Sequence, residues 1–546
     1  MPSAAVLAPV ALPLVAAGVV ALLGLFGLNP GRVVGGVGAW TGAAALFAVW
    51  LPVRESVELV LGPLGYGSAF DLRIDAVAFA FGLMVVLPSA VLLSLQPRTW
   101  QEVALSLLAI SASLAAVEAG GVVLTAIAGC TTATLAVVLL DTEDAKAARP
   151  SWGLLLVGWL SLAWVGVLFQ IRGGTAVYSA VPLATVSVPL FALLAGAALV
   201  ISSVLPWRAW PTRLWARPSL RAAPIVIATL FPLGFYILVR GYELGDGRYP
   251  QPFFNAVLSV LGVVAAFAAG VRAQAASTRR EFLGEVMPGF GGFALMAIAL
   301  GTPLGLVAGL VMLGTAAGLV ACLALLPDRA GIASLVTIAA AVGLPPGLAF
   351  GARAIGIEAT FEAGDFLGLI GLAGAATWAM WMAAGARAIG LAAGSGHPSV
   401  ETFPRIALGI AAISFVAGPA LAVIQFAYGN PVATETMPSA AGSLAGGLTS
   451  VVTTSSVLPV VTLFVPLLVI LLAAYAAGGM STIKTQARPA LFQIQVPAVL
   501  HGLGQTLRAL TVPEQYRSIL SLAELESMVT TGSPLLWLAA VAALVF

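Results

Sequence analysis

The feature that most constrains this chain is a succession of apolar stretches, each close to the length of a membrane span, that recurs along most of its 546 residues. A bilayer core about 30 Å thick needs roughly 20 apolar residues per spanning helix. Apolar residues make up 60% of the sequence and charged residues only 8%, which is far from the balance of a soluble domain. The sequence therefore predicts an all-α fold, a polytopic bundle of transmembrane helices, and excludes an ordinary water-soluble fold.

We expect about fifteen spanning helices at roughly 20 residues each. The predicted ranges are 4–27, 33–51, 73–95, 102–118, 121–140, 152–170, 181–205, 219–240, 252–274, 288–308, 309–326, 331–356, 364–390, 404–428 and 456–478. Charged residues spaced among leucines from 479 to 533 are typical of amphipathic helices on the membrane surface. The apolar residues 534–546 are too few for a standard span.

Two apolar segments contain prolines that should break them. Pro206 interrupts one apolar run, and Pro345 with Pro346 interrupts another. Proline removes a backbone donor, so the freed carbonyls need partners in protein or in a water-filled cavity. Broken helices at membrane depth often form ion and substrate sites, whereas a kink that serves packing alone is the alternative at either position.

One block is more specific than the composition. From Val200 to Arg240 the chain can be aligned, without a gap, with a signature that reads Lys-Ser-Ala, then Pro-Phe-His-x-Trp, Gly-Pro-Thr-Pro and Gly-x-Tyr-Leu-x-x-Arg. The matching residues are Ser202, Pro206, Trp210, Pro218, Gly234, Tyr236 and Arg240. This block resembles the antiporter-like membrane subunits of proton-translocating NADH:quinone oxidoreductase, membrane-bound hydrogenase and multisubunit cation/proton antiporter complexes.

Weaker pieces extend the resemblance over roughly residues 70–390. They are Leu72–Asp75, Arg279 and Arg280 with Gly291, and Gly343–Pro346 with Phe350 and Arg353. The resemblance implies two antiporter-like halves, 71–240 and 241–390, each with one broken helix. N-terminal helices in 1–70 and C-terminal helices in 391–478 would flank them, followed by the surface segment and short apolar helix of 479–546.

The family's proton route runs along intramembrane Glu, Lys and His side chains, and this chain departs from that pattern. The positions that carry those groups in the family fall here on Cys130, Ile201 and Val226, and farther on near Met312, Ala316 and Val320. Only Arg353 keeps a charge at its position. The chain has two lysines and two histidines, Lys146, Lys484, His397 and His501, and all four lie in predicted loops or in the amphipathic stretch. Arginine remains protonated and is a poor proton relay, so the resemblance implies a degenerate proton path.

Several side chains remain to be interpreted. Glu118 is the best remaining candidate for a functional intramembrane carboxylate, although Gly120 directly after it makes a helix end the alternative. Arg353 is the second ion-pathway candidate, as a fixed charge. Asp75 should start a helix, and the charged residues from 141 to 149 should form a solvated loop. Cys130 and Cys322 lie in apolar runs and predict buried thiols without a metal site.

These observations favour a membrane subunit of a respiratory-type oxidoreductase complex that binds no cofactor or metal and is not catalytic by itself. Its partners would be other membrane subunits, a peripheral redox or enzymatic arm and the lipid bilayer, without nucleic acid. We expect it in a prokaryotic cytoplasmic membrane. Two alternatives stay open: the membrane partner of a solute or inorganic-carbon uptake system, and an independent secondary transporter.

Overall fold

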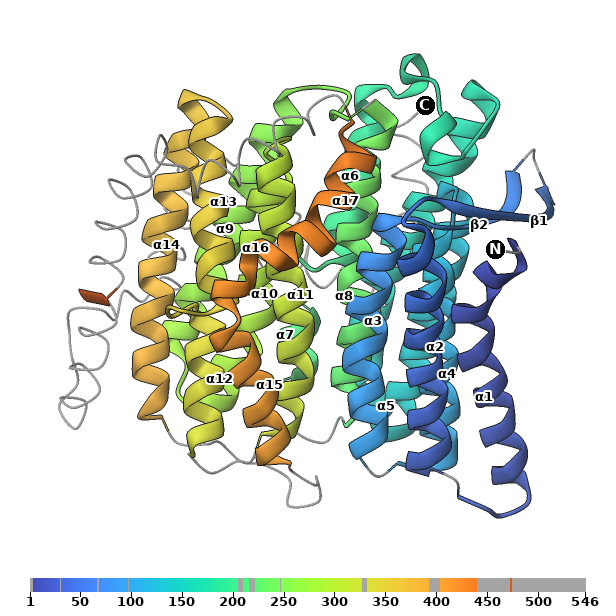
Figure 1. Ribbon diagram of the computed structural model, residues 1–546, viewed down its shortest axis with the longest axis horizontal. Coiled ribbons are helices and arrows are strands. Elements are labelled where there is room, and N and C mark those ends of the chain that lie inside the picture. The colour runs from blue at the N-terminus through green and yellow to red at the C-terminus, as the bar shows by residue number, and fades with distance from the viewer. Residues whose placement is uncertain are drawn as a thin grey trace, which may run out of the picture.

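The computed structural model describes residues 3–29, 31–65, 68–96, 98–204, 210–215, 221–245, 247–326, 331–391, 403–438 and 472–473. Its helices run roughly side by side and form one bundle (Figure 1). Within these residues, eleven helices are long and apolar enough to cross a membrane. The predicted all-α, polytopic bundle is therefore confirmed. The predicted span 456–478 and the amphipathic stretch 479–533 lie almost wholly outside the described residues, as do Lys484, His397 and His501.

The N-terminal part begins with long helices and contains one hairpin. Its elements are α1 (Ala8–Leu25), α2 (Gly31–Val53), β1 (Val57–Gly65), β2 (Ser68–Ile74), α3 (Ala76–Leu95), α4 (Trp100–Glu118), α5 (Val122–Gly173), α6 (Val188–Ile201), α7 (Trp210–Trp215) and α8 (Ala223–Arg240).

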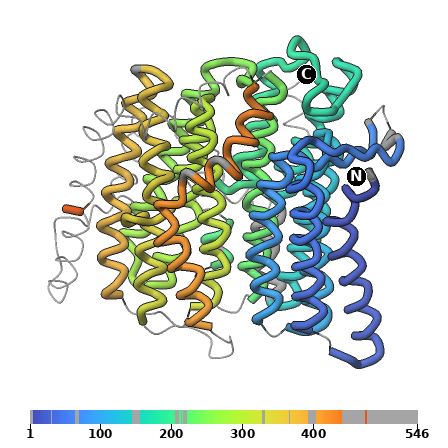
Figure 2. The backbone as a smooth tube through the Cα atoms, in the orientation of Figure 1, coloured from blue at the N-terminus to red at the C-terminus, as the bar shows by residue number. Residues whose placement is uncertain are grey.

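The second part continues the bundle. Its elements are α9 (Phe253–Ala275), α10 (Arg279–Ile298), α11 (Pro303–Leu325), α12 (Ile332–Val342), α13 (Leu348–Glu362), α14 (Asp365–Ile389), α15 (Pro404–Val416), α16 (Leu421–Ile424), a π-helical turn (Gln425–Gly429) and α17 (Asn430–Thr436). The segment from α15 to α17 crosses the front of the bundle obliquely (Figure 2).

The β1–β2 hairpin is an element that the sequence pattern does not predict. The two strands are antiparallel, with Val57 opposite Ile74, and they lie at one end of the bundle (Figure 1). The backbone N–H of Gly120 donates to the carbonyl of Asp71 at 3.0 Å, which attaches β2 to the end of α4. The predicted span 73–95 therefore starts too early, because its first residues belong to β2 and α3 begins at Ala76.

Helix α5 contains two spans rather than one. Gly121 before it pairs with Val177 after it, and the N–H of Val122 donates to the carbonyl of Ala176 at 2.9 Å. The two ends of the element are therefore adjacent, so the chain reverses between the apolar stretches Val122–Glu143 and Leu155–Gly173. The prediction of a solvated loop at 141–149 is wrong, because the backbone there is helical.

Two predicted boundaries need correction. The spans 288–308 and 309–326 are in fact α10 and α11, separated at Gly301, which has a φ of +73°, and at Thr302, whose side chain caps α11. Pro303 follows as the first residue of α11, a position that tolerates proline. The span 181–205 is shortened to α6, because two short 3-10 turns precede it.

Close helix contacts in the bundle depend on small residues. A Cβ at Gly262 in α9 would collide with the backbone of Met296 in α10, and a Cβ at Gly292 in α10 would collide with the backbone of Ala266 in α9. Membrane helices use small residues in this way, since packing rather than hydrophobic burial drives their association.

Candidate functional site

Asp75 stands at the junction of β2 and α3 and is fully buried. Its Oδ1 accepts a hydrogen bond from the backbone N–H of Ala78 at 2.8 Å. The side chain therefore caps α3, as the sequence predicts, and places a negative charge at the positive end of the helix dipole.

Two arginines converge on this carboxylate. Nη1 of Arg240, the last residue of α8, lies 2.7 Å from Oδ2 of Asp75, and Nη2 lies 2.9 Å from Oδ1. Nε of Arg73 in β2 lies 2.7 Å from Oδ2. Burial by itself raises the pKa of Asp75, but the charges of Arg240 and Arg73 hold that pKa well below its ordinary value. Asp75 is therefore ionised throughout the physiological range.

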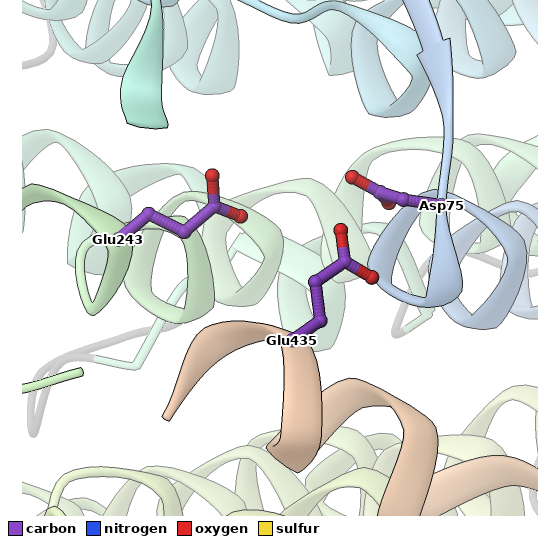
Figure 3. Close-up of side chains that lie close together, drawn as sticks. All are labelled: Asp75, Glu243 and Glu435. Atoms are coloured by element: carbon purple, nitrogen blue, oxygen red, sulfur yellow. The ribbon is translucent and has the colours of Figure 1, made fainter. Parts of the chain in front are cut away.

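Two glutamates complete the cluster. Glu243, in the 3-10 turn Glu243–Gly245 after α8, accepts from Nη2 of Arg73 at 2.8 Å and pairs with Nη1 of Arg240. Glu435 of α17 accepts from the backbone N–H of Ala76 at 2.9 Å. Oxygens of the three carboxyl groups lie within 4.8 Å of one another, and Figure 3 shows the three side chains converging from three elements. We call Arg73, Asp75, Arg240, Glu243 and Glu435 the ion network.

Three clustered carboxyl groups suggest a cation site, but the arginines argue against a divalent ion. The guanidinium groups of Arg73 and Arg240 already donate to oxygens of Asp75 and Glu243. A divalent cation among the same oxygens would face two positive charges at close range. The arrangement has the chemistry of a buried ion-pair network rather than that of a metal centre.

Glu118, the first ion-pathway candidate, is the last residue of α4 and is fully buried. Neither of its carboxyl oxygens has a hydrogen-bond partner among the described residues. The next residue, Ala119, pairs with Leu72 of β2, and its carbonyl accepts from the hydroxyl of Tyr236 at 3.1 Å. Glu118 therefore sits at a helix end, yet inside the protein and at the same end of the bundle as the ion network.

Arg353, the second candidate, fills the second helix break. Its Nη2 donates to the carbonyl of Ala341 at 3.0 Å and its Nη1 to the carbonyl of Val342, the last residues of α12. Nε1 of Trp378 also donates to the carbonyl of Val342, at 2.9 Å. The guanidinium carbon lies 4.8 Å from the ring centres of Phe290 and Phe293. Arg353 thus caps the C-terminal end of α12 and is held by aromatic faces.

At the first helix break, a neutral side chain rather than an arginine donates to the end of the half-helix. Helix α6 ends at Ile201, and Nε1 of Trp210 at the start of α7 donates to the Ile201 carbonyl at 3.1 Å. The backbone N–H of Trp210 in turn donates to Oγ of Ser203 at 3.0 Å. Pro206 itself lies outside the described residues, whereas Pro345 and Pro346 lie in the turn between α12 and α13.

The other replaced positions are apolar or thiol groups in the bundle. Val226 in α8 and Met312 and Val320 in α11 are buried, and Cys130 in α5 is half-buried. A Cβ at Gly129, next to Cys130, would collide with the ring of Trp159 from the returning span of α5.

Sequence reasoning finds Asp75 and Arg240 separately and misses Glu243 and Glu435. Glu243 closely follows the apolar helix α8, and Glu435 lies in α17, shortly after an apolar segment. Acidic residues beside apolar segments are rare in a chain with only 8% charged residues. That signal could have drawn attention to both, but only the fold brings them to Asp75.

No family model and no curated protein matches the sequence. Solved structures do match. A chain from the structure of the Mrp complex from Dietzia sp. DQ12-45-1b superposes with a TM-score of 0.67 at 19% identity, over 93% of this chain and 63% of that chain. The present chain thus spans a little under two thirds of that chain's length.

Two further structures come from respiratory complexes. A chain of the membrane-bound sulfane sulfur reductase, described as an archaeal respiratory membrane complex, gives a TM-score of 0.63 at 17% identity, over 76% of this chain and 75% of that one. A chain of respiratory complex I from Thermus thermophilus gives 0.63 at 19% identity, over 81% and 99%. The chain therefore has the fold of the antiporter-like membrane subunits that its Val200 to Arg240 block resembles.

Proposed function

We propose that this chain is the antiporter-like membrane subunit of a multisubunit respiratory-type oxidoreductase complex, and that the family's own proton route is closed in it. Its fold neighbours are chains of an Mrp complex, of a sulfane sulfur reductase and of complex I, which supports membrane partners. The observation that carries the closed route is that Trp210 and Arg353 fill the two helix breaks.

The physical argument concerns the ends of the half-helices. In carriers with broken helices, the exposed carbonyls at the C-terminal end of a half-helix attract the transported cation. Here the carbonyl of Ile201 is taken by an indole N–H, and the carbonyls of Ala341 and Val342 are taken by a guanidinium group. A permanent positive charge at the second break also repels a passing cation. The chain would then serve as a structural or coupling element of its complex.

The first test is purification of the native chain in mild detergent, with mass spectrometry of everything that remains bound and a redox assay of the product. We expect co-purifying membrane subunits and a peripheral subunit with redox centres. A lone chain that exchanges ions in vesicles would contradict the proposal. If a soluble partner without redox centres co-purifies instead, the chain is the membrane partner of an uptake system and the proposal is wrong.

The closed route has its own test. The purified chain in vesicles with an interior pH-sensitive dye should give no more proton flux under an imposed pH gradient than empty vesicles. If flux appears and is lost in Glu118→Gln, protons pass by way of Glu118 and the route is open. If flux appears and is lost in Arg353→Met, the guanidinium takes part in conduction and the capping role is insufficient.

A further inference from the structure

The ion network carries an excess of one negative charge when all its groups are ionised. Arg73 and Arg240 contribute two positive charges, and Asp75, Glu243 and Glu435 contribute three negative ones. Asp75 and Arg240 are fully buried, and the side chains of Arg73 and Glu243 are only 11% and 7% exposed. An unpaired charge in such buried surroundings costs free energy, so binding of one more positive charge would stabilise the cluster.

Geometry identifies the acid that is left over. Asp75 forms ion pairs with both terminal nitrogens of Arg240 and with Nε of Arg73. Glu243 forms ion pairs with both arginines. Glu435 accepts from the backbone N–H of Ala76, and one of its carboxyl oxygens lies within 4.8 Å of an oxygen of Asp75. Two carboxyl groups this close repel each other when both are ionised, so the arrangement favours a proton on one of them. Glu435 is therefore the group on which the compensating charge resides.

Glu435 also lies where a proton can control structure. Its bond to Ala76 joins parts of the chain that are 359 residues apart, and the Tyr428 hydroxyl joins the π-helical turn to the carbonyl of Ala80 at 3.0 Å. These two hydrogen bonds fasten the segment Gln425–Thr436 to the first turns of α3. Loss of the proton would place a second carboxylate beside Asp75 and weaken this attachment.

We propose that Glu435 is a proton-binding site beside the ionised Asp75, and that this proton holds the segment Gln425–Thr436 against the start of α3. The charged groups nearest Glu435 are Asp75 at the start of α3, Arg240 of α8 and Glu243 of the turn after it. Arg73 of β2 pairs with Asp75 and Glu243, and Tyr428 lies on the neighbouring π-helical turn. This inference does not depend on the role of the chain in a complex.

The electrostatics agree with this assignment. Burial, followed by the negative charge of Asp75, raises the pKa of Glu435 to about 9. When the segment is attached to α3, the pKa of Glu435 lies above its ordinary value of 4.5, so the attachment is fully stabilised by the proton below that pH. It weakens as the pH rises towards about 9 and changes no further above that value.

The direct test is infrared difference spectroscopy of the full chain in nanodiscs during a pH titration. We expect a protonated-carboxyl band that disappears with a midpoint near 9, is shifted by ¹³C-glutamate labelling and is absent in Glu435→Gln. Glu55→Gln, at an exposed position, should leave the band unchanged. A band with a midpoint near 9 that survives in Glu435→Gln overturns the assignment, and so does a band with that midpoint that is shifted by ¹³C-aspartate labelling and not by ¹³C-glutamate. The isotope shift is measured on the unaltered chain, so the test stands even if the variant does not fold.

A second measurement addresses the structural consequence and a rival ion. Amide hydrogen exchange at Ala76–Phe79, corrected for its intrinsic pH dependence, should increase by up to about tenfold per pH unit below pH 9 in the unaltered chain. It should be independent of pH in Glu435→Gln, because the amide oxygen can still accept from the N–H of Ala76 and the side chain carries no charge. Equal pH dependence in both proteins contradicts the proposal. A midpoint that moves when sodium replaces choline would assign the site to a monovalent cation instead.

Discussion

Arg240 and Asp75 are separated by 165 residues in the sequence, yet both terminal nitrogens of Arg240 lie within 2.9 Å of the two carboxylate oxygens of Asp75. Both side chains are fully buried. The pair joins the end of α8 to the start of α3, so it connects the ends of two helices that are far apart in the sequence. Bidentate geometry of this kind is both strong and specific.

Removal of this arginine should be strongly destabilising. We expect Arg240→Gln to lower the free energy of unfolding by about 3–5 kcal/mol, because it leaves a buried carboxylate without its principal partner. Thermal unfolding in nanodiscs measures the effect, with Arg248→Gln at an exposed position as the control. The double variant with Asp75→Asn should lose less than the sum of the two single variants. Strict additivity would contradict a direct interaction.

Arg353 should matter for stability and not for conduction. Arg353→Met leaves the carbonyls of Ala341 and Val342 without their guanidinium donor, which should cost about 1–3 kcal/mol. Arg353→Lys should recover only part of this, since an ammonium group lacks the planar pair of donors and the aromatic stacking. Chemical unfolding of the parent chain, Arg353→Lys and Arg353→Met measures the order of their stabilities. An unfolding curve for Arg353→Met that coincides with that of the parent chain would contradict the capping role.

The β1–β2 hairpin should respond to pH through Asp71. Burial, followed by the carboxylate of Glu58 on the neighbouring strand, raises the pKa of Asp71 from 3.8 to about 6. Because the pKa in the folded state is the higher one, the contribution of Asp71 is fully present below about pH 4 and is lost as the pH rises through about 6.

Amide exchange along Ser68–Ile74, corrected for its intrinsic rate, should therefore rise between about pH 4 and 6. The rise should be absent in Asp71→Asn and displaced to lower pH in Glu58→Gln, which removes one cause of the raised pKa. A profile that is the same in all three proteins would show that Asp71 does not titrate in the folded hairpin.

The contact between α9 and α10 should tolerate no added methyl group. Gly292→Ala should destabilise the bundle by about 1–3 kcal/mol, because its Cβ would collide with the backbone of Ala266. Gly196→Ala in α6 has nothing within 4 Å of the new Cβ, and it should be neutral or slightly stabilising because alanine favours helix. The midpoint temperatures of thermal unfolding of the two variants should therefore shift in opposite directions or by clearly different amounts.

Much of the architecture can be predicted from apolar length alone, but its boundaries depend on local signals. The start of α3 is predictable because Asp75 precedes a long apolar run, and the structure shows it as the cap. The division between α10 and α11 is missed because the apolar run continues through it. Gly301 and Thr302 carried the signal there, as a left-handed residue followed by a capping side chain.

The site is less predictable than the fold, for a physical reason. The sequence shows that Arg353 is a poor relay, but its role as a cap depends on the path of the chain between α12 and α13. Asp75 and Arg240 are recognisable one by one as a helix start and a motif ending. Their pairing, and the approach of Glu435 from the far end of the chain, are tertiary facts that no local pattern encodes.

The order of synthesis gives the last member of the ion network a particular position. Arg73, Asp75, Arg240 and Glu243 emerge first, and these four side chains hold two positive and two negative charges, so they can pair with no net charge. Glu435 is made almost two hundred residues later. A newly inserted C-terminal segment must therefore find a partner whose charges are already balanced, and it can dock there only as an uncharged acid. Under the proposed assignment, docking of α17 against the start of α3 is therefore coupled to the protonation of Glu435.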